Sequence, residues 1–146
     1  MKRFKFKKVR ISNKGINIEI NLERFEKQFQ RAQYYLDGQV MTDMVPYMPH
    51  RNGIFINLTR ARSASAQGSG KVYAAFGPSG RFLYEGKVMV DPVTNSPWAR
   101  KGAKKVVTER ELKYGNPKAQ PRWFEVAKKR HKRQWVKEVK NIAGGK

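Results

Sequence analysis

The sequence contains no cysteine and only two histidines, His50 and His131, among its 146 residues. It therefore has no disulfide framework, no thiolate nucleophile and no cysteine-based zinc site, and too few imidazoles for a histidine-rich metal site. Nor does any stretch approach the roughly 18 apolar residues of a membrane span, and the basic N-terminus lacks the apolar segment of a signal peptide. We therefore expect a protein that is made and used in a cytoplasm, without a membrane partner.

Acidic residues are also scarce, since 11 Asp and Glu stand against 32 Lys and Arg and the net charge is +21. The excess is uneven: residues 1–14 carry seven basic residues and no acid, residues 15–98 nine and seven, and residues 99–146 sixteen and four. A near-neutral centre with basic ends indicates a globular middle flanked by elements that face DNA or an acidic neighbouring subunit. A merely solvated, soluble surface is the alternative.

The length and the apolar content of 39% predict one domain with one core over residues 1–146. Residues 4–20 predict two strands around Asn13-Lys14-Gly15, because isoleucines at 16, 18 and 20 alternate with polar residues. In the first strand Phe4 and Phe6 are out of phase with Val9 and Ile11. That mismatch indicates either a bulge near residues 7–8 or loose pairing.

Two segments show the three- and four-residue spacing of amphipathic helices. The first follows a candidate cap at Asn21 and ends near Val45, before Pro46; its stripe is Leu22, Phe25, Phe29, Ala32, Leu36, Val40 and Met44. The second follows Pro121; its stripe is Phe124, Ala127, His131, Trp135, Val139 and Ile142. The other face of this second helix can engage several phosphates through Lys128, Lys129, Lys132, Arg133, Lys137 and Lys140.

Between these helices the composition predicts strands at residues 54–59 and 71–76, joined as a hairpin by a flexible loop at 63–70. Residues 77–121 are rich in Gly and Pro and predict a long arm with short strands. The expected fold is α+β. It has basic N-terminal strands (1–20), a long helix plus hairpin with a small antiparallel sheet (21–76), an extended arm (77–121) and a basic C-terminal helix (122–142).

Most patterns that would carry catalysis fail on inspection. Gly68-Ser69-Gly70-Lys71 is similar to a phosphate-binding loop, but the motif needs Gly at Ser65, Ser or Thr at Val72, and a following helix where we expect a strand. Asp37 and Asp43 lie six residues apart on different helix faces, so we interpret them as solvated charges. These observations predict no catalytic residue, no metal and no cofactor.

The remaining candidates are aromatic or titratable residues near the arm and the last helix. Glu85 is expected to form an ion pair with a neighbouring subunit, and His131 to be a core histidine. Phe124 and Trp135 lie on the apolar stripe and are expected in the core, with base stacking as the alternative. Trp123 lies near the edge of that stripe and is predicted to contact a partner.

Four segments together resemble the minor capsid protein family of tailed phages. They are Val45-Pro46-Tyr47-Met48-Pro49 after the first helix, Phe82-Leu83-Tyr84-Glu85-Gly86-Lys87-Val88, Ser96-Pro97-Trp98-Ala99-Arg100-Lys101-Gly102, and Pro121-Arg122-Trp123-Phe124-Glu125-Val126-Ala127-Lys128. The family looks related to head-tail connector and tail-completion proteins of long-tailed phages. The similarity covers residues 17–142, so residues 1–20 are largely an addition without an assigned role.

The resemblance implies a structural virion protein, not an enzyme, that forms a ring of about six or twelve copies at the head-tail junction. Its implied partners are itself and other neck, portal-adaptor and tail proteins, and packaged DNA is a further candidate partner. We expect subunit contacts in the arm at Phe82, Tyr84, Glu85, Trp98 and Arg100. The competing hypotheses are a basic nucleic-acid-binding module of the ribosome-associated type and, less compatible with so few acids, a metal-dependent nuclease.

Overall fold

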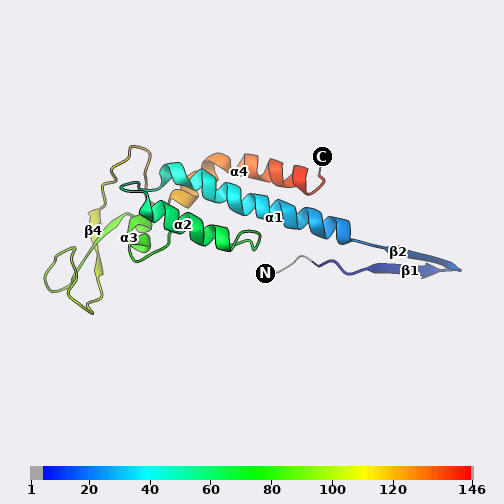
Figure 1. Ribbon diagram of the computed structural model, residues 1–146, viewed down its shortest axis with the longest axis horizontal. Helices are drawn as coiled ribbons and strands as arrows, with labels where there is room; N and C mark the ends of the chain where they lie inside the picture. The colour runs from blue at the N-terminus through cyan, green and yellow to red at the C-terminus, as the bar shows by residue number, and fades with distance from the viewer. Residues whose placement is uncertain (1–4, 146) are drawn as a thin grey trace.

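The computed structural model describes residues 5–145, and these form an α+β fold. In chain order the elements are β1 (Val9–Asn13), β2 (Ile16–Ile20), α1 (Glu23–Met44), the 3-10 turn η1 (Val45–Tyr47), α2 (Ile54–Ser65), α3 (Gly80–Glu85), β3 (Lys87–Val90), β4 (Val106–Glu111) and α4 (Trp123–Ile142). Figure 1 shows the helices α1, α2 and α4 side by side in the middle of an elongated molecule. The β1–β2 hairpin projects at one end and the β3–β4 sheet lies at the other.

The predicted N-terminal hairpin is confirmed, with strands shorter than expected. Its turn places Lys14 and Gly15 at φ of 44° and 83°, the left-handed conformations that a tight two-residue hairpin turn requires. Strand β1 begins at Val9, whereas Phe6 lies outside it: its ring packs on Phe29 and its backbone N–H donates to Glu26 at 2.6 Å. Because Phe6 contacts α1 and is not part of the strand, it need not share the phase of Val9 and Ile11. Phe4 lies outside the described residues.

Helices α1 and α4 are confirmed close to their predicted bounds and pack antiparallel. Near one end the Trp135 indole N–H donates to Asp43 at 2.6 Å, and at the other Gly144 lies beside Gln28. The core forms where the second half of α1, η1, α2 and α4 meet, and it contains Val40, Met41, Met44, Tyr47, Met48, Ile56, Trp123, Ala127 and Trp135. The first half of the α1 stripe is less covered, because Phe25 and Phe29 remain partly exposed.

The predicted strand at residues 54–59 is wrong, because this segment is the first half of helix α2. Gly53, at φ 76°, turns the chain, and the Asn52 side chain accepts the Ile54 N–H at 3.2 Å. Ile56, Thr59 and Ser63 then fall on one buried face at helical spacing. The β-branched residues of this segment favoured the strand prediction. The helix forms because it buries this face against α1.

The strand predicted at residues 71–76, and with it the second hairpin, is also absent from the structure. This segment has no regular secondary structure, with a bend at Ala74, and side chains of α2 bind its backbone. The Tyr73 N–H donates to the Ser63 hydroxyl at 3.0 Å, and the Phe76 N–H donates to the Thr59 hydroxyl at 3.2 Å. The small antiparallel sheet lies instead in the arm, where β3 pairs with β4.

The expected flexible loop at residues 63–70 is instead the end of α2, up to Ser65, followed by turns over residues 66–70 that Asp37 closes. This carboxylate is buried, and its Oδ2 accepts the N–H groups of Gly68 at 2.7 Å and Gly70 at 3.0 Å, while its Oδ1 accepts from Gln33 at 2.7 Å. The interpretation of Asp37 as a solvated charge is therefore wrong. The two glycine N–H groups that resembled a phosphate cradle already bind the chain's own carboxylate.

Trp123 is wholly buried, which corrects its predicted place at a partner surface. Its indole N–H donates to the Ala74 carbonyl at 2.7 Å, and its ring packs edge-on against Tyr84 and Phe55. Arg122 adopts a left-handed conformation at φ 52° immediately before α4. The chain therefore turns just before α4. For this reason the spacing of apolar residues along α4 did not predict that the side chain of its first residue, Trp123, is buried.

Candidate interaction site

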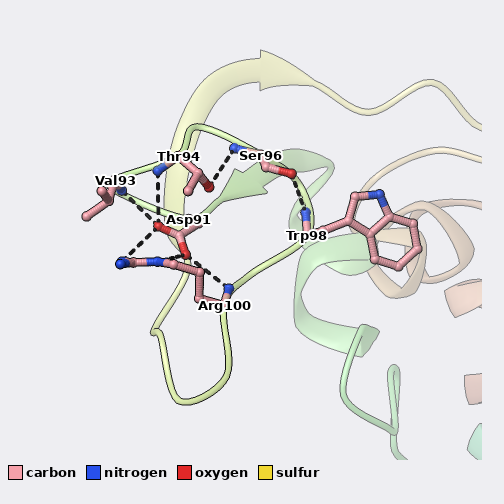
Figure 2. Close-up of polar contacts among 6 residues, drawn as sticks. All are labelled: Asp91, Val93, Thr94, Ser96, Trp98 and Arg100. Carbon is pink, nitrogen blue, oxygen red and sulfur yellow. Dashed lines mark hydrogen bonds and ion pairs between the residues drawn. The ribbon is translucent and has the colours of Figure 1, made fainter.

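The arm contains a loop, residues 91–100, that closes around the single carboxylate of Asp91. This side chain follows β3 and is wholly buried. Its Oδ1 accepts the backbone N–H groups of Val93 at 2.8 Å and Thr94 at 3.3 Å, and its Oδ2 accepts that of Arg100 at 3.1 Å (Figure 2). The start and the end of the loop are therefore tied to the same group.

The Arg100 guanidinium completes this arrangement with two hydrogen bonds to the same carboxylate. Its Nε lies 2.9 Å from Oδ2 and an Nη lies 3.3 Å from Oδ1, which is the bidentate geometry that arginine favours (Figure 2). The Arg100 side chain and the backbone donors hold the pKa of Asp91 well below its usual value. In turn, Asp91 raises the pKa of Arg100. Both groups stay charged at neutral pH, so the loop is ordered there.

This ordered loop presents Trp98 to solvent. The Ser96 hydroxyl accepts the Trp98 N–H at 3.1 Å, while the indole points away from Asp91 and is 85% exposed (Figure 2). Val93 in the same loop is also largely exposed. A large aromatic side chain on a loop that needs no further ordering is suited to anchor a partner, because less conformational entropy is lost on binding.

The other three predicted arm residues lie on α3 and bind within their own chain. The Tyr84 hydroxyl donates to Glu125, and burial, assisted by this hydrogen bond, raises the pKa of Tyr84. Phe82 is half-buried with a lysine ammonium over its ring, and Glu85 forms an exposed ion pair with Arg122 at 3.5 Å. Thus Glu85 has a partner in its own subunit, although the prediction named a neighbour.

Sequence reasoning named Trp98 and Arg100 but missed Asp91, the residue that orders the loop. A signal for it exists in Asp91-Pro92-Val93-Thr94-Asn95-Ser96, since an Asp before turn-forming residues commonly accepts N–H groups two and three positions later. Asn95, at φ 54°, adopts the left-handed conformation that such a turn needs. The ion pair between Asp91 and Arg100 could not be predicted in the same way, because it depends on the path by which the loop brings residue 100 back to residue 91.

The second feature is the basic face of α4. The five predicted residues on it are exposed: Lys128, Lys129, Lys132, Arg133 and Lys137. Trp135 and Ala127 lie on the opposite, buried side of the helix. His131 stacks on Trp135 with ring centroids 6.3 Å apart. The aromatic residues of the stripe therefore pack inside, and the exposed cations form a surface for phosphates or carboxylates.

Other candidate chemistry is absorbed by the fold. Asp43, predicted to be a solvated charge, instead accepts hydrogen bonds from Trp135 at 2.6 Å and from Gln39 at 3.0 Å. Among residues 5–145 no group of three or more His, Asp or Glu side chains is arranged to hold a metal ion. Within the same residues, no helix combines the length and the apolar character needed to cross a membrane.

Comparisons of the chain with models of known protein families, with curated proteins and with solved structures find no match.

Proposed function

We propose that the chain is a structural subunit of a tailed-phage particle, a minor capsid or head-tail connector protein that assembles as a ring at the head-tail junction. The observation that carries this proposal is the exposed indole of Trp98 on a loop ordered around the buried carboxylate of Asp91. The residues that resemble the minor capsid protein family include this loop. The proposal assigns the protein an assembly role and no catalytic step.

The physical argument starts from the cost of exposing Trp98. An isolated indole in water loses the favourable free energy of burial, and aromatic residues in ordered loops are frequent anchors of protein interfaces. The loop does not rearrange to present it, because Asp91 and Arg100 already fix both ends. A subunit that must meet copies of itself and other neck, portal-adaptor and tail proteins benefits from such an anchor.

The basic face of α4 supports a position near the DNA conduit. Five exposed cations on one helix attract a polyanion or an acidic protein ring, and α4 carries only two acids, Glu125 and Glu138. In the proposed ring this face is directed towards packaged DNA or towards an acidic neighbouring subunit.

The test is to replace Trp98 with alanine in a phage that encodes the chain and to locate the labelled protein in purified virions by electron microscopy. We expect the variant to fold but to leave particles without a joined tail. Leu58→Ala is the matched control, because Leu58 is an exposed apolar residue on α2, outside the proposed contact surfaces. Normal particles from Trp98→Ala, or a label away from the head-tail junction, would contradict the proposal.

The second candidate is a basic nucleic-acid-binding module, which the exposed cations of α4 favour. If five of them contact phosphates, binding to duplex DNA should weaken about 500-fold between 50 and 200 mM salt. Tight binding of the isolated chain with this salt dependence, together with its absence from virions, would favour this candidate over the connector. Binding that ignores salt would exclude a role for these cations at phosphates.

A further inference from the structure

The N-terminal hairpin leaves a whole apolar face uncovered. The register pairs Val9 with Ile20 and Ile11 with Ile18, so five β-branched side chains lie on one face: Val9, Ile11, Ile16, Ile18 and Ile20. Each is between 41% and 66% exposed. Together they present on the order of 400 Å² of apolar surface, the size of the largest patch on a typical monomer. A two-stranded hairpin is only marginally stable alone in water, and additional strands stabilise it.

Both small sheets of the molecule also have open edges. Each contains two strands among the described residues, so β1 and β4 carry no third strand on their outer sides. An open edge offers unpaired N–H and C=O groups to a strand from another chain. The two sheets lie at opposite ends of the molecule (Figure 1), so contact between them has to involve two copies.

The charges of the two edge strands are complementary. On the polar face of the hairpin Lys8 and Arg10 share one carboxylate, Glu19, at 3.5 and 3.4 Å. On β4 the carboxylates of Glu109 and Glu111 lie on either side of Arg110 in the sequence, and the Glu111 side chain is 85% exposed and 4.0 Å from a single lysine. The hairpin thus has an excess of cations where β4 has two of the few acids of this chain.

We propose that β1 of one copy adds to the open edge of β4 in the next copy, which creates a four-stranded sheet between subunits. This inference deepens the proposed ring-forming function and rests on it. In the register that we propose for the joined sheet, Arg10 lies beside Glu109, and the valine and isoleucine face of the hairpin continues the face of Val106. Because the two surfaces differ and lie at opposite ends, the contact runs head to tail. The ring of the proposed function requires in addition that the rotation from one copy to the next closes, since a head-to-tail contact without closure gives an open filament.

Charge decides between a second copy and a nucleic acid as the occupant of the hairpin. A nucleic acid would neutralise the cations but would leave the backbone edge of β1 unpaired. A neighbouring β4 strand pairs that edge and places the hairpin in a sheet of more than two strands, which is more stable than a hairpin alone. It also opposes hairpin cations with acids, which reduces the repulsion between copies of a chain with a net charge of +21.

The test uses charge reversal and its rescue in the full-length chain, with self-association measured by sedimentation velocity. Arg10→Glu and Glu109→Lys should each weaken self-association roughly 10-fold, because each replaces opposite charges by like charges across a strand pair. The double variant restores the pair and the original net charge, and it should regain the affinity of the unmodified protein. Arg60→Glu makes the same charge change on the exposed side of α2 and should not weaken self-association.

A cysteine pair provides a direct second measurement, because the chain contains no other cysteine. A mixture of Arg10→Cys and Glu109→Cys chains should form a disulfide-linked dimer under mild oxidation, since a disulfide requires Cα atoms within about 7 Å. Arg10→Cys mixed with Lys129→Cys should not. A chain that stays monomeric at high concentration, or a double charge variant without rescue and without the cross-link, would overturn the inference.

The failures of the two proposals can be told apart. Virions that carry the labelled protein at the head-tail junction, with normal incorporation of Arg10→Glu, would overturn the hairpin contact and leave the connector function in place. A chain that passes the rescue and cross-linking tests but is absent from virions would overturn the connector function and keep the contact between copies.

Discussion

Replacing Trp98 with alanine should separate assembly from folding, and the structure sets the size of each effect. About 15% of the residue's surface is buried in the monomer, because it is 85% exposed. For an aromatic side chain of up to roughly 250 Å² this is on the order of 40 Å², which at about 25 cal/mol per Å² contributes about 1 kcal/mol. The free energy of unfolding of the isolated chain should therefore fall by about 1 kcal/mol or less.

Assembly should respond more strongly. An anchoring tryptophan at an interface typically costs about 2 kcal/mol or more when truncated, which is roughly a 30-fold loss of affinity. Trp123→Ala is the matched comparison, since Trp123 is wholly buried and hydrogen-bonded to Ala74. Its loss should lower the free energy of unfolding by about 3–5 kcal/mol.

Urea denaturation of both variants gives the two unfolding free energies, and sedimentation with purified neck proteins measures assembly. Circular dichroism checks that each variant is folded at the start. If Trp98→Ala destabilised the monomer as much as Trp123→Ala, or bound its partners with unchanged affinity, the reasoning about an exposed anchor would be refuted.

The two buried carboxylates and the basic face of α4 give three further predictions. The native pKa of Asp91 lies below its unfolded value near 4, so its contribution to stability should be complete above about pH 5 and be lost progressively as the pH falls below about 4. The free energies of unfolding of Asp91→Asn and of the unmodified chain, measured with urea, should accordingly differ at pH 7 and converge at low pH. An equal difference at the two pH values would show that the charge of the Asp91 carboxylate does not stabilise the fold. Asp37→Ala leaves two glycine N–H groups without their acceptor and should lower the free energy of unfolding by about 3 kcal/mol in the same assay, whereas a change below about 1 kcal/mol would show that water replaces the carboxylate. Replacing Arg133 and Lys137 together with serine should reduce the salt slope of DNA binding by about two, measured by titration from about 50 to 200 mM salt, and an unchanged slope would place the DNA elsewhere.

The long helices were predictable because their spacing is unambiguous. In α1 and α4 apolar residues recur over about five turns, and Pro46 and Pro121 mark the boundaries. The hairpin was equally clear from the alternation of isoleucines around a Lys14-Gly15 turn. Helix α2 was missed because Ile54, Phe55 and Ile56 favour strands locally, whereas the contacts that stabilise the helix are made to another element, α1, and leave no local signal.

The candidate site was predictable in part. The exposure of Trp98 agrees with an apolar arm that a small domain does not fully cover. Asp91 was missed because its role depends on five hydrogen bonds that the loop brings together in space. Glu85 was expected to pair with a neighbour, but the chain returns so that Arg122 lies beside it.

The sequence by itself determined the α+β class, the hairpin, the two amphipathic helices and the basic face of α4, because each depends on local periodicity or charge. Only the tertiary structure decided that Trp123 is buried and Trp98 exposed, and that Asp37, Asp43 and Asp91 are bound rather than solvated. These outcomes depend on which distant segments meet, and a buried carboxylate is stable only where several donors converge on it. Convergence of donors from distant segments, such as the N–H groups of Gly68 and Gly70 on Asp37, is a property of the folded chain and has no local pattern.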